Sequence, residues 1–398
     1  MASPGTSRSV RALPPDIWAL GLVSLFMDTS SELVHSLLPV FMTSVLGAGV
    51  LTVGLVEGTA EAAASVMKVI SGVMSDRLRK RKPLVVLGYG LAAITKPLFP
   101  MASSVTWVFA ARFIDRIGKG IRGAPRDALV ADITPPELRG AAYGLRQALD
   151  SIGAFVGPAL AILLMVWLAN DIKAVLWAAV VPAVLAVAVL VVWVREPEPN
   201  EHQTSAAGSV TVTTIRELPR RYWLVVGIGS VFTLARFSEA FLVLRAQDAG
   251  LAMAYIPAVM IVMNVVYAGT AYPAGRAADR FPGRSLLVVG LATLVVADVI
   301  LATAHRPSTV FLGAACWGLH MALTQGVLSK LVAEDVPARL RGTAFGIFNL
   351  ASGGAVLLAS VTAGALWSRV GPSATFLAGA TFAIVAILAL LAYQPARP

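Results

Sequence analysis

Long apolar runs alternate with short polar segments along the whole chain. A helix needs about 20 apolar residues to cross a bilayer, and each run approaches or exceeds that length. The pattern predicts twelve spans, at 16–45, 50–74, 83–102, 105–130, 140–168, 172–194, 222–246, 252–274, 285–304, 308–332, 342–368 and 372–393. No alternating β pattern interrupts them, so the predicted fold class is an all-α membrane protein.

The composition supports this prediction, with 57% apolar residues, 14% charged residues and a mean hydropathy of +0.77. A formal charge of +10 would suit a nucleic-acid-binding protein, but in a membrane protein such charge gathers in cytoplasmic loops. Cys316 is the single cysteine, which excludes disulfides within the chain and a Cys-rich metal site.

Lys and Arg outside the runs are unevenly distributed. Most lie in alternate connections and in the two tails, at Arg8, Arg11, Arg77, Arg79, Lys80, Arg81, Lys82, Arg139, Arg195, Arg216, Arg220, Arg221, Arg276, Arg280, Arg284, Lys330, Arg339, Arg341 and Arg397. The other side has only Lys96, Lys173, Arg245, Arg306 and Arg369. The positive-inside rule therefore predicts a multi-pass protein of the inner (plasma) membrane with both termini cytoplasmic. The polar N-terminal tail has no cleavable signal pattern, so the first run is expected to remain as a helix.

The two halves of the chain repeat one another. Residues 139–146 (RGAAYGLR) return as 341–348 (RGTAFGIF), displaced by 202 positions. A repeat at half the length of a membrane protein is the usual architecture of a secondary transporter. The polar, Pro-bearing segment 196–221 separates the halves. We predict bundles at 1–195 and 222–398, joined by a cytoplasmic linker at 196–221.

A loop motif follows the second run. Its Gly72, Asp76 and Arg77 resemble the Gly-x-Leu-x-Asp-Arg-x-Gly-Arg-Lys loop of the major facilitator superfamily, and Asp279 and Arg280 repeat it in the second half. The resemblance implies two six-helix bundles that expose a central site alternately to either side. It also implies that these residues form a cytoplasmic gate.

Two further motifs resemble the twelve-helix drug/proton antiporters of that superfamily. Gly153, Gly157 and Pro158 match the Gly-x-x-x-Gly-Pro antiporter motif in the fifth run. Arg112 with Asp132 looks like the Arg motif of the fourth. Small residues allow close helix approach and Pro opens a backbone bond, so we expect the glycines and Pro158 to serve gating. Asp132 is assigned to the gate as well.

The fourth run carries a charged face that has no counterpart in the second half. Arg112, Asp115, Arg116, Lys119, Arg122 and Arg126 fall within about 120° of an ideal helix. Because a charge at mid-bilayer costs about 2.5–3.5 kcal/mol, the face must meet water, an anion or acidic partners. We predict substrate binding by Arg112, Arg116, Lys119, Arg236, Glu239 and His320.

Static ion pairs are the alternative interpretation of these charges. It fits best at the cytoplasmic end of the face, at Arg122, Arg126, Asp127 and Asp132, because gate salt bridges are typical there. Asp150 is expected to pair with Arg146, one turn earlier on the fifth run.

Paired acids provide candidates for proton coupling. Asp28 and Glu32 lie one turn apart in the first run, and Glu57 and Glu61 do so in the second. Two like charges in a low dielectric favour a proton on one of them. We predict that these four, with Asp115, carry protons. The alternative is neutral carboxylic acids hydrogen-bonded between helices.

The predicted function is export of a small anionic or zwitterionic solute by proton antiport, without cofactor, resident metal or enzymatic activity. Its partners are then the solute, protons and the lipid bilayer, with no nucleic acid, and the protein is expected to be a monomer. A proton-coupled uptake symporter is one alternative. A nickel or iron exporter that uses His35, His320 and the first-helix acids is another. A sensor or a lipid-processing enzyme on a transporter fold would need a soluble module or a nucleophile, and the sequence shows neither.

Overall fold

The computed structural model describes residues 13–78, 80–196, 217–324, 327, 332, 336 and 340–392. Within these residues the chain is helical and contains no β-strand, which confirms the all-α fold class. Nine helical segments of this part are long and apolar enough to cross a membrane.

The elements follow the apolar runs closely. Those of the first half are α2 (Pro15–Val40), the π-helical turn η1 (Phe41–Val45), α3 (Val50–Leu78), α4 (Lys82–Thr95), α5 (Leu98–Met101), α6 (Val105–Ile133), the 3-10 turn η2 (Pro136–Leu138), α7 (Arg139–Trp167), α8 (Ile172–Ala178) and α9 (Val180–Trp193). Those of the second half are α11 (Arg220–Leu234), α12 (Ala240–Asp248), the 3-10 turn η3 (Met253–Tyr255), α13 (Ala258–Arg280), α14 (Gly283–Ala302), α15 (Pro307–Thr324), α17 (Arg341–Arg369) and α18 (Pro372–Ala392).

Three of the predicted spans fall outside the nine, each for its own reason. Helix α6 is long enough, but its charges make it too polar. The seventh run is broken into α11 and α12, because residues 235–239 leave the helix. Helix α15 is described continuously only as far as Thr324, and most of the rest of its run lies outside the described residues.

Proline and capping residues set several helix ends. Helices α2, α15 and α18 begin at Pro15, Pro307 and Pro372, where the missing N–H costs nothing. Helix α4 ends at Thr95 because Pro97 cannot continue it. Ser104 caps α6 by accepting a hydrogen bond from the backbone N–H of Trp107 at 3.3 Å.

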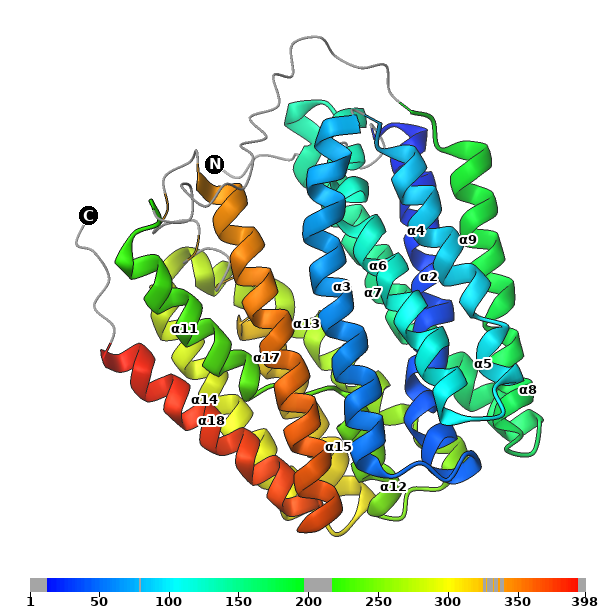
Figure 1. Cartoon of the computed structure of the whole chain (residues 1–398), viewed down its shortest axis with the longest axis vertical. Helices are drawn as coiled ribbons and strands as arrows, with labels where there is room; N and C mark the ends of the chain where they lie inside the picture. The colour runs from blue at the N-terminus through cyan, green and yellow to red at the C-terminus, as the bar shows by residue number, and fades with distance from the viewer. Residues whose placement is uncertain are drawn as a thin grey trace, which may run out of the picture. The chain divides into compact units, whose positions relative to one another are not determined.

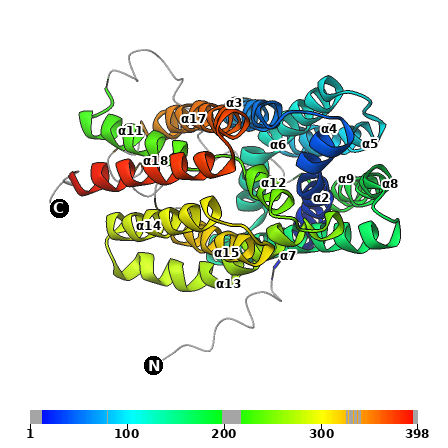
Figure 2. The same ribbon diagram turned by 90° about the horizontal axis from the view of Figure 1, so that it is seen from below.

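The chain divides into two compact units, one of 1–38 with 66–205 and the other of 39–65 with 206–398. In the first unit α4 packs against α6 and α9 (Figure 1). In the second unit α14 packs against α15 and α18, and α13 packs on α15 (Figure 2). The predicted bundle limits at 195 and 222 remain predictions, and most of the linker lies outside the described residues.

The contact between α4 and α6 depends on glycine. A Cβ atom at Gly88 would lie 2.6 Å from the carbonyl oxygen of Gly118, and a Cβ at Gly118 would meet Gly88 O at the same distance. Both approaches are too short for any side chain, so the two backbones touch directly. This close approach holds α6, and with it the charged face, directly against α4 in the first unit.

Candidate functional site

Helix α6 places most of its charged face inside the first unit. Arg112, Asp115, Arg116 and Arg122 are between 1% and 5% exposed, whereas Lys119 is exposed. Arginine side chains are almost never this buried without partners. The burial therefore requires acids or polar groups from neighbouring helices.

Asp115 is neutralised from the break between α4 and α5. Lys96 Nζ lies 2.8 Å from Asp115 Oδ1 and donates a second hydrogen bond to Ser31 Oγ on α2 at 3.1 Å. Arg112 Nη1 is 3.9 Å from the other oxygen of Asp115. A buried carboxylate with two cations around it is held in its charged form.

Lys96, which the sequence prediction counted among the cations of the non-cytoplasmic side, lies at the break between α4 and α5. It is 1% exposed, because the chain turns at Pro97 and directs the lysine inward. Arg245 is a second such case. It is 4% exposed, and it donates hydrogen bonds to the Leu301 and Ala304 carbonyls at the end of α14. Both cations are therefore buried in the fold and do not lie in exposed connections.

The α2 acids lie opposite the cations of α6. The ionisable side chains near Glu32 include His35, Lys119 and Arg116, and His35 Nδ1 is 3.5 Å from Glu32 Oε2. Asp28 is acted on by Arg122 and Lys119, by Glu32 itself and by Asp150 of α7. Acids and cations of three helices are thus gathered in one unit.

Helix α7 lies against α2 at these same acids. A Cβ at Gly153 would lie 2.6 Å from Leu25 O and 3.0 Å from the Cβ of Asp28. At Gly157 the corresponding distances are 2.6 Å to Thr29 O and 3.0 Å to the Cβ of Glu32. The expected close approach is therefore present. Helix α7 runs on through Pro158 as one element.

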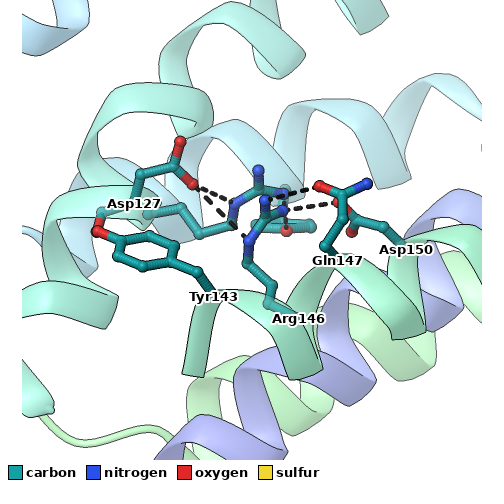
Figure 3. Close-up of polar contacts among 7 residues, drawn as sticks. Asp127, Tyr143, Arg146, Gln147 and Asp150 are labelled. Atoms are coloured by element: carbon teal, nitrogen blue, oxygen red, sulfur yellow. Dashed lines mark hydrogen bonds and ion pairs between the residues drawn. The ribbon is translucent and has the colours of Figure 1, made fainter. Parts of the chain in front are cut away.

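A second group of ion pairs, apart from Asp28 and Glu32 of α2, joins α7 to α6. Arg146 lies between two acids, with Nη1 2.6 Å from Asp150 Oδ2 and Nε 4.0 Å from Asp127 Oδ1 (Figure 3). The pairing of Arg146 with Asp150 is confirmed. Tyr143 adds a hydrogen bond from its hydroxyl to the Asp127 carbonyl at 2.7 Å. These contacts join α6 to α7.

Tyr89 of α4 contacts Arg122 and Arg126, the last two cations of the charged face of α6. The guanidinium of Arg122 stands over its ring at 4.5 Å from the centroid, and Arg126 Nη1 donates to its hydroxyl at 3.4 Å. Tyr89 is fully buried. Nothing in the sequence pattern singled it out, because an aromatic residue in an apolar run is normally core.

The other predicted acids lie elsewhere in the fold. Glu57 is fully buried and Glu61 half-buried, on the part of α3 that belongs to the second unit. There Gly58 packs against Leu357 of α17, where a Cβ would meet the Leu357 Cα at 3.1 Å. Glu57 and Glu61 therefore belong to the second unit, whereas Asp28 and Glu32 belong to the first.

The predicted residues of the second half are spread over its unit. Arg236 Nη2 lies 4.0 Å from Glu239 Oε1 at the break between α11 and α12. His320 is fully buried on α15, and its Nδ1 is 2.8 Å from the Gly290 carbonyl. Within the described ranges, no three His, Cys, Asp or Glu residues are placed to hold a metal.

The predicted gate is described only in part. Gly72 of α3 lies against α6, where its Cβ would be 3.5 Å from Ala124 Cβ. Asp132 pairs with Arg81 Nε at 3.4 Å. Arg280 is exposed at the end of α13. The side chains of Asp76, Arg77 and Asp279 lie outside the described residues.

Similarity to known proteins extends over most of the chain. The sequence profile of the Major Facilitator Superfamily matches residues 20–263 and 237–398. The uncharacterized MFS-type transporter MJ1317 of Methanocaldococcus jannaschii is 34% identical over 390 residues, 96% of this chain and 95% of that protein. The multidrug resistance protein MdtH of Edwardsiella ictaluri is 25% identical, over 81% of this chain and 80% of its own. The crystal structure of the nucleoside transporter NupG superposes with a TM-score of 0.76 at 13% identity, covering 96% of this chain and all of that one (100%).

Proposed function

The chain belongs to the Major Facilitator Superfamily, and from this membership we propose that it is a proton-coupled exporter of a small zwitterionic or anionic solute. Membership makes it a multi-pass membrane transporter. The solute and the coupling ion are our inference from the site in the first unit.

The carrying observation is the meeting of opposite charges at the contact of α2, α6 and α7. Asp28 and Glu32 supply the acids, while Arg116 and Lys119 supply cations that act on Glu32. Lys119 is exposed, so a solute can reach it. A site with both signs binds either a zwitterion or a proton together with an anion.

These two kinds of solute couple to protons in opposite ways. The ammonium group of a zwitterion takes the place of a proton at Asp28 or Glu32, which gives exchange. A plain anion binds Arg116 and Lys119 best when the acids are protonated, which gives symport. We favour exchange, because the Gly153–Gly157 contact resembles the antiporter motif and a multidrug resistance protein is among the relatives.

Asp115 is set aside as a proton carrier. Lys96 and Arg112 already neutralise its carboxylate inside the unit, and protonation would leave the buried Lys96 without its partner. We propose that Asp115 positions Arg112 and Lys96 beneath the solute. Glu57 and Glu61 remain candidates for a separate role on α3.

Proteoliposomes provide the test. Vesicles are given an acidic interior and offered a radiolabelled amino-acid mixture, an organic dicarboxylate mixture or a lipophilic cation. Proton antiport predicts gradient-driven uptake of the amino acids, lost in the double variant Asp28→Asn, Glu32→Gln. The matched control is Asp171→Asn, an exposed residue whose replacement keeps the N-cap of α8.

The direction of the effective gradient decides between the alternatives. Dicarboxylate uptake driven by an acidic exterior would establish the symporter instead. Solute uptake that ignores both gradients and the double variant would contradict proton coupling altogether.

A further inference from the structure

Asp298 is a buried acid in the middle of α14 that the proposed transport site does not use. Its side chain is fully buried, and neither carboxylate oxygen has a hydrogen-bond partner among the described residues. Among the described residues no charged group acts on the Asp298 carboxyl, and its removal from water is the one electrostatic influence on it. An ionised carboxylate in such a place is strongly unfavourable, so the group is neutral in this conformation.

Among the described residues, the elements around α14 offer Asp298 no counter-ion. Helix α18 has no ionisable side chain. The ionisable side chains on the other neighbouring elements are, in the described part, Cys316 and His320 on α15, Arg236 and Glu239 at the break, Arg245 and Asp248 on α12, and Tyr267, Tyr272, Arg276 and Arg280 on α13. Arg245 is committed to the Leu301 and Ala304 carbonyls and to Asp248, and Arg236 faces Glu239.

The carboxyl of Asp298 reaches the break in the seventh span. A Cβ at Gly379 would lie 2.7 Å from Asp298 Oδ2, 3.0 Å from Phe237 Cε1 and 3.3 Å from the Ala235 carbonyl oxygen. These three groups therefore meet in the space of one missing methyl group. No backbone N–H in the described part donates to the Ala235 carbonyl outside a helix, so a protonated carboxyl has an acceptor close by.

The break is the natural place for a change of conformation. Residues 235–239 have left the helix. The centroid of the Phe237 ring lies 5.4 Å from that of Trp317 and 5.5 Å from that of Phe376. Movement of this segment would remove the apolar cover from Asp298 and admit water. The same segment carries Arg236 and Glu239.

We propose that Asp298 is a second proton-binding site, neutral while Phe237 covers it and ionised when the break opens to water. This inference rests on the proposed function, because it adds to the α2 acids a proton site in the second unit. Its proton leaves as hydronium to water at the opened break and returns by the same route, so no other reactant is needed.

Infrared difference spectroscopy of the purified protein in lipid tests the site directly. The wild type is expected to show the carbonyl band of a neutral carboxylic acid in mildly acidic buffer, and to lose it in alkaline buffer as carboxylate forms. Asp298→Asn should abolish this band and its pH response. Gly379→Ala, which presses a methyl group on Oδ2, should shift the band, and this variant serves if Asp298→Asn does not fold.

The variant Asp28→Asn, Glu32→Gln separates this inference from the proposed function. The Asp298 band must persist there even if flux is uncoupled from protons. The inference would be overturned if the carbonyl band were unaffected by both Asp298→Asn and Gly379→Ala. It would also be overturned if the band persisted at every pH where the protein is folded, because the acid would then never ionise. Neither result would touch coupling by the α2 acids.

Discussion

The ammonium of Lys96 and the carboxylate of Asp115 form an ion pair of 2.8 Å, and their side chains are 1% and 4% exposed. They come from the end of α4 and from α6, 19 residues apart in sequence. Two opposite charges this deep each depend on the other for their place in the fold. Removing one leaves the other buried without this pair, whereas removing both leaves neither of the two.

Lys96→Met and Asp115→Asn are each expected to lower the free energy of unfolding by about 3–5 kcal/mol, because each strands a buried charge. The double variant should be less destabilised than the sum of the two. The midpoint of thermal unfolding in detergent measures all three. Strict additivity would contradict the pairing.

Gly153→Ala and Gly157→Ala should each destabilise the protein by about 1–3 kcal/mol, because a methyl group would meet a backbone oxygen at 2.6 Å. Gly144→Ala on the same helix is the control, since a Cβ there has nothing within 4 Å. It should stabilise by up to about 1 kcal/mol through helix propensity. Equal effects at all three positions, measured by thermal unfolding, would refute the contact.

Tyr89→Phe keeps the ring beneath Arg122 and loses the hydroxyl that accepts from Arg126. Its expected cost is about 0.5–1.5 kcal/mol, the net value of one hydrogen bond. Tyr89→Leu also removes the cation–π contact and should cost at least another 0.5 kcal/mol or so. Unfolding midpoints that do not differ between the two variants would show that the ring contributes nothing beyond its volume.

Glu196, which follows α9, caps the N-terminus of α4. Its two carboxylate oxygens accept from the backbone N–H groups of Arg81 and Lys82 at 2.6 Å and 3.0 Å. Glu196→Ala is expected to cost about 0.5–2 kcal/mol, and Glu196→Gln less, since an amide oxygen still accepts. Amide exchange should accelerate at both Arg81 and Lys82 in Glu196→Ala, and at only one of them in Glu196→Gln, whose amide has a single oxygen acceptor.

The sequence predicted the helices well because each depends on a local property, the length of an apolar run. It was less informative where a run is interrupted. The break at 235–239 contains no proline, and the hydroxyl of Ser360 on α17 accepts from Ser238 N–H at 3.3 Å within it. Such a partner is known only once the fold is known.

The site shows the same limit. The α6 face, the α2 acids and the α7 glycines were each predictable from spacing along one helix. Their meeting was not, because contacts between helices leave no trace in the period of any one of them. Lys96 was misplaced for that reason, and Asp298 is a single acid in an apolar run, whose spacing points to no partner.

The contact of Gly153 and Gly157 with α2 has one more consequence. Neither glycine inserts a side chain between the residues of α2, whereas Leu149, one turn before Gly153 on α7, occupies the space that a Cβ at Gly21 of α2 would need. Leu149 therefore fixes the alignment of the two helices at one point, and the charges around Asp28, which include Asp150, act beside it. Sliding of α7 along α2 would have to move Leu149 out of the gap at Gly21 as well as change those charges.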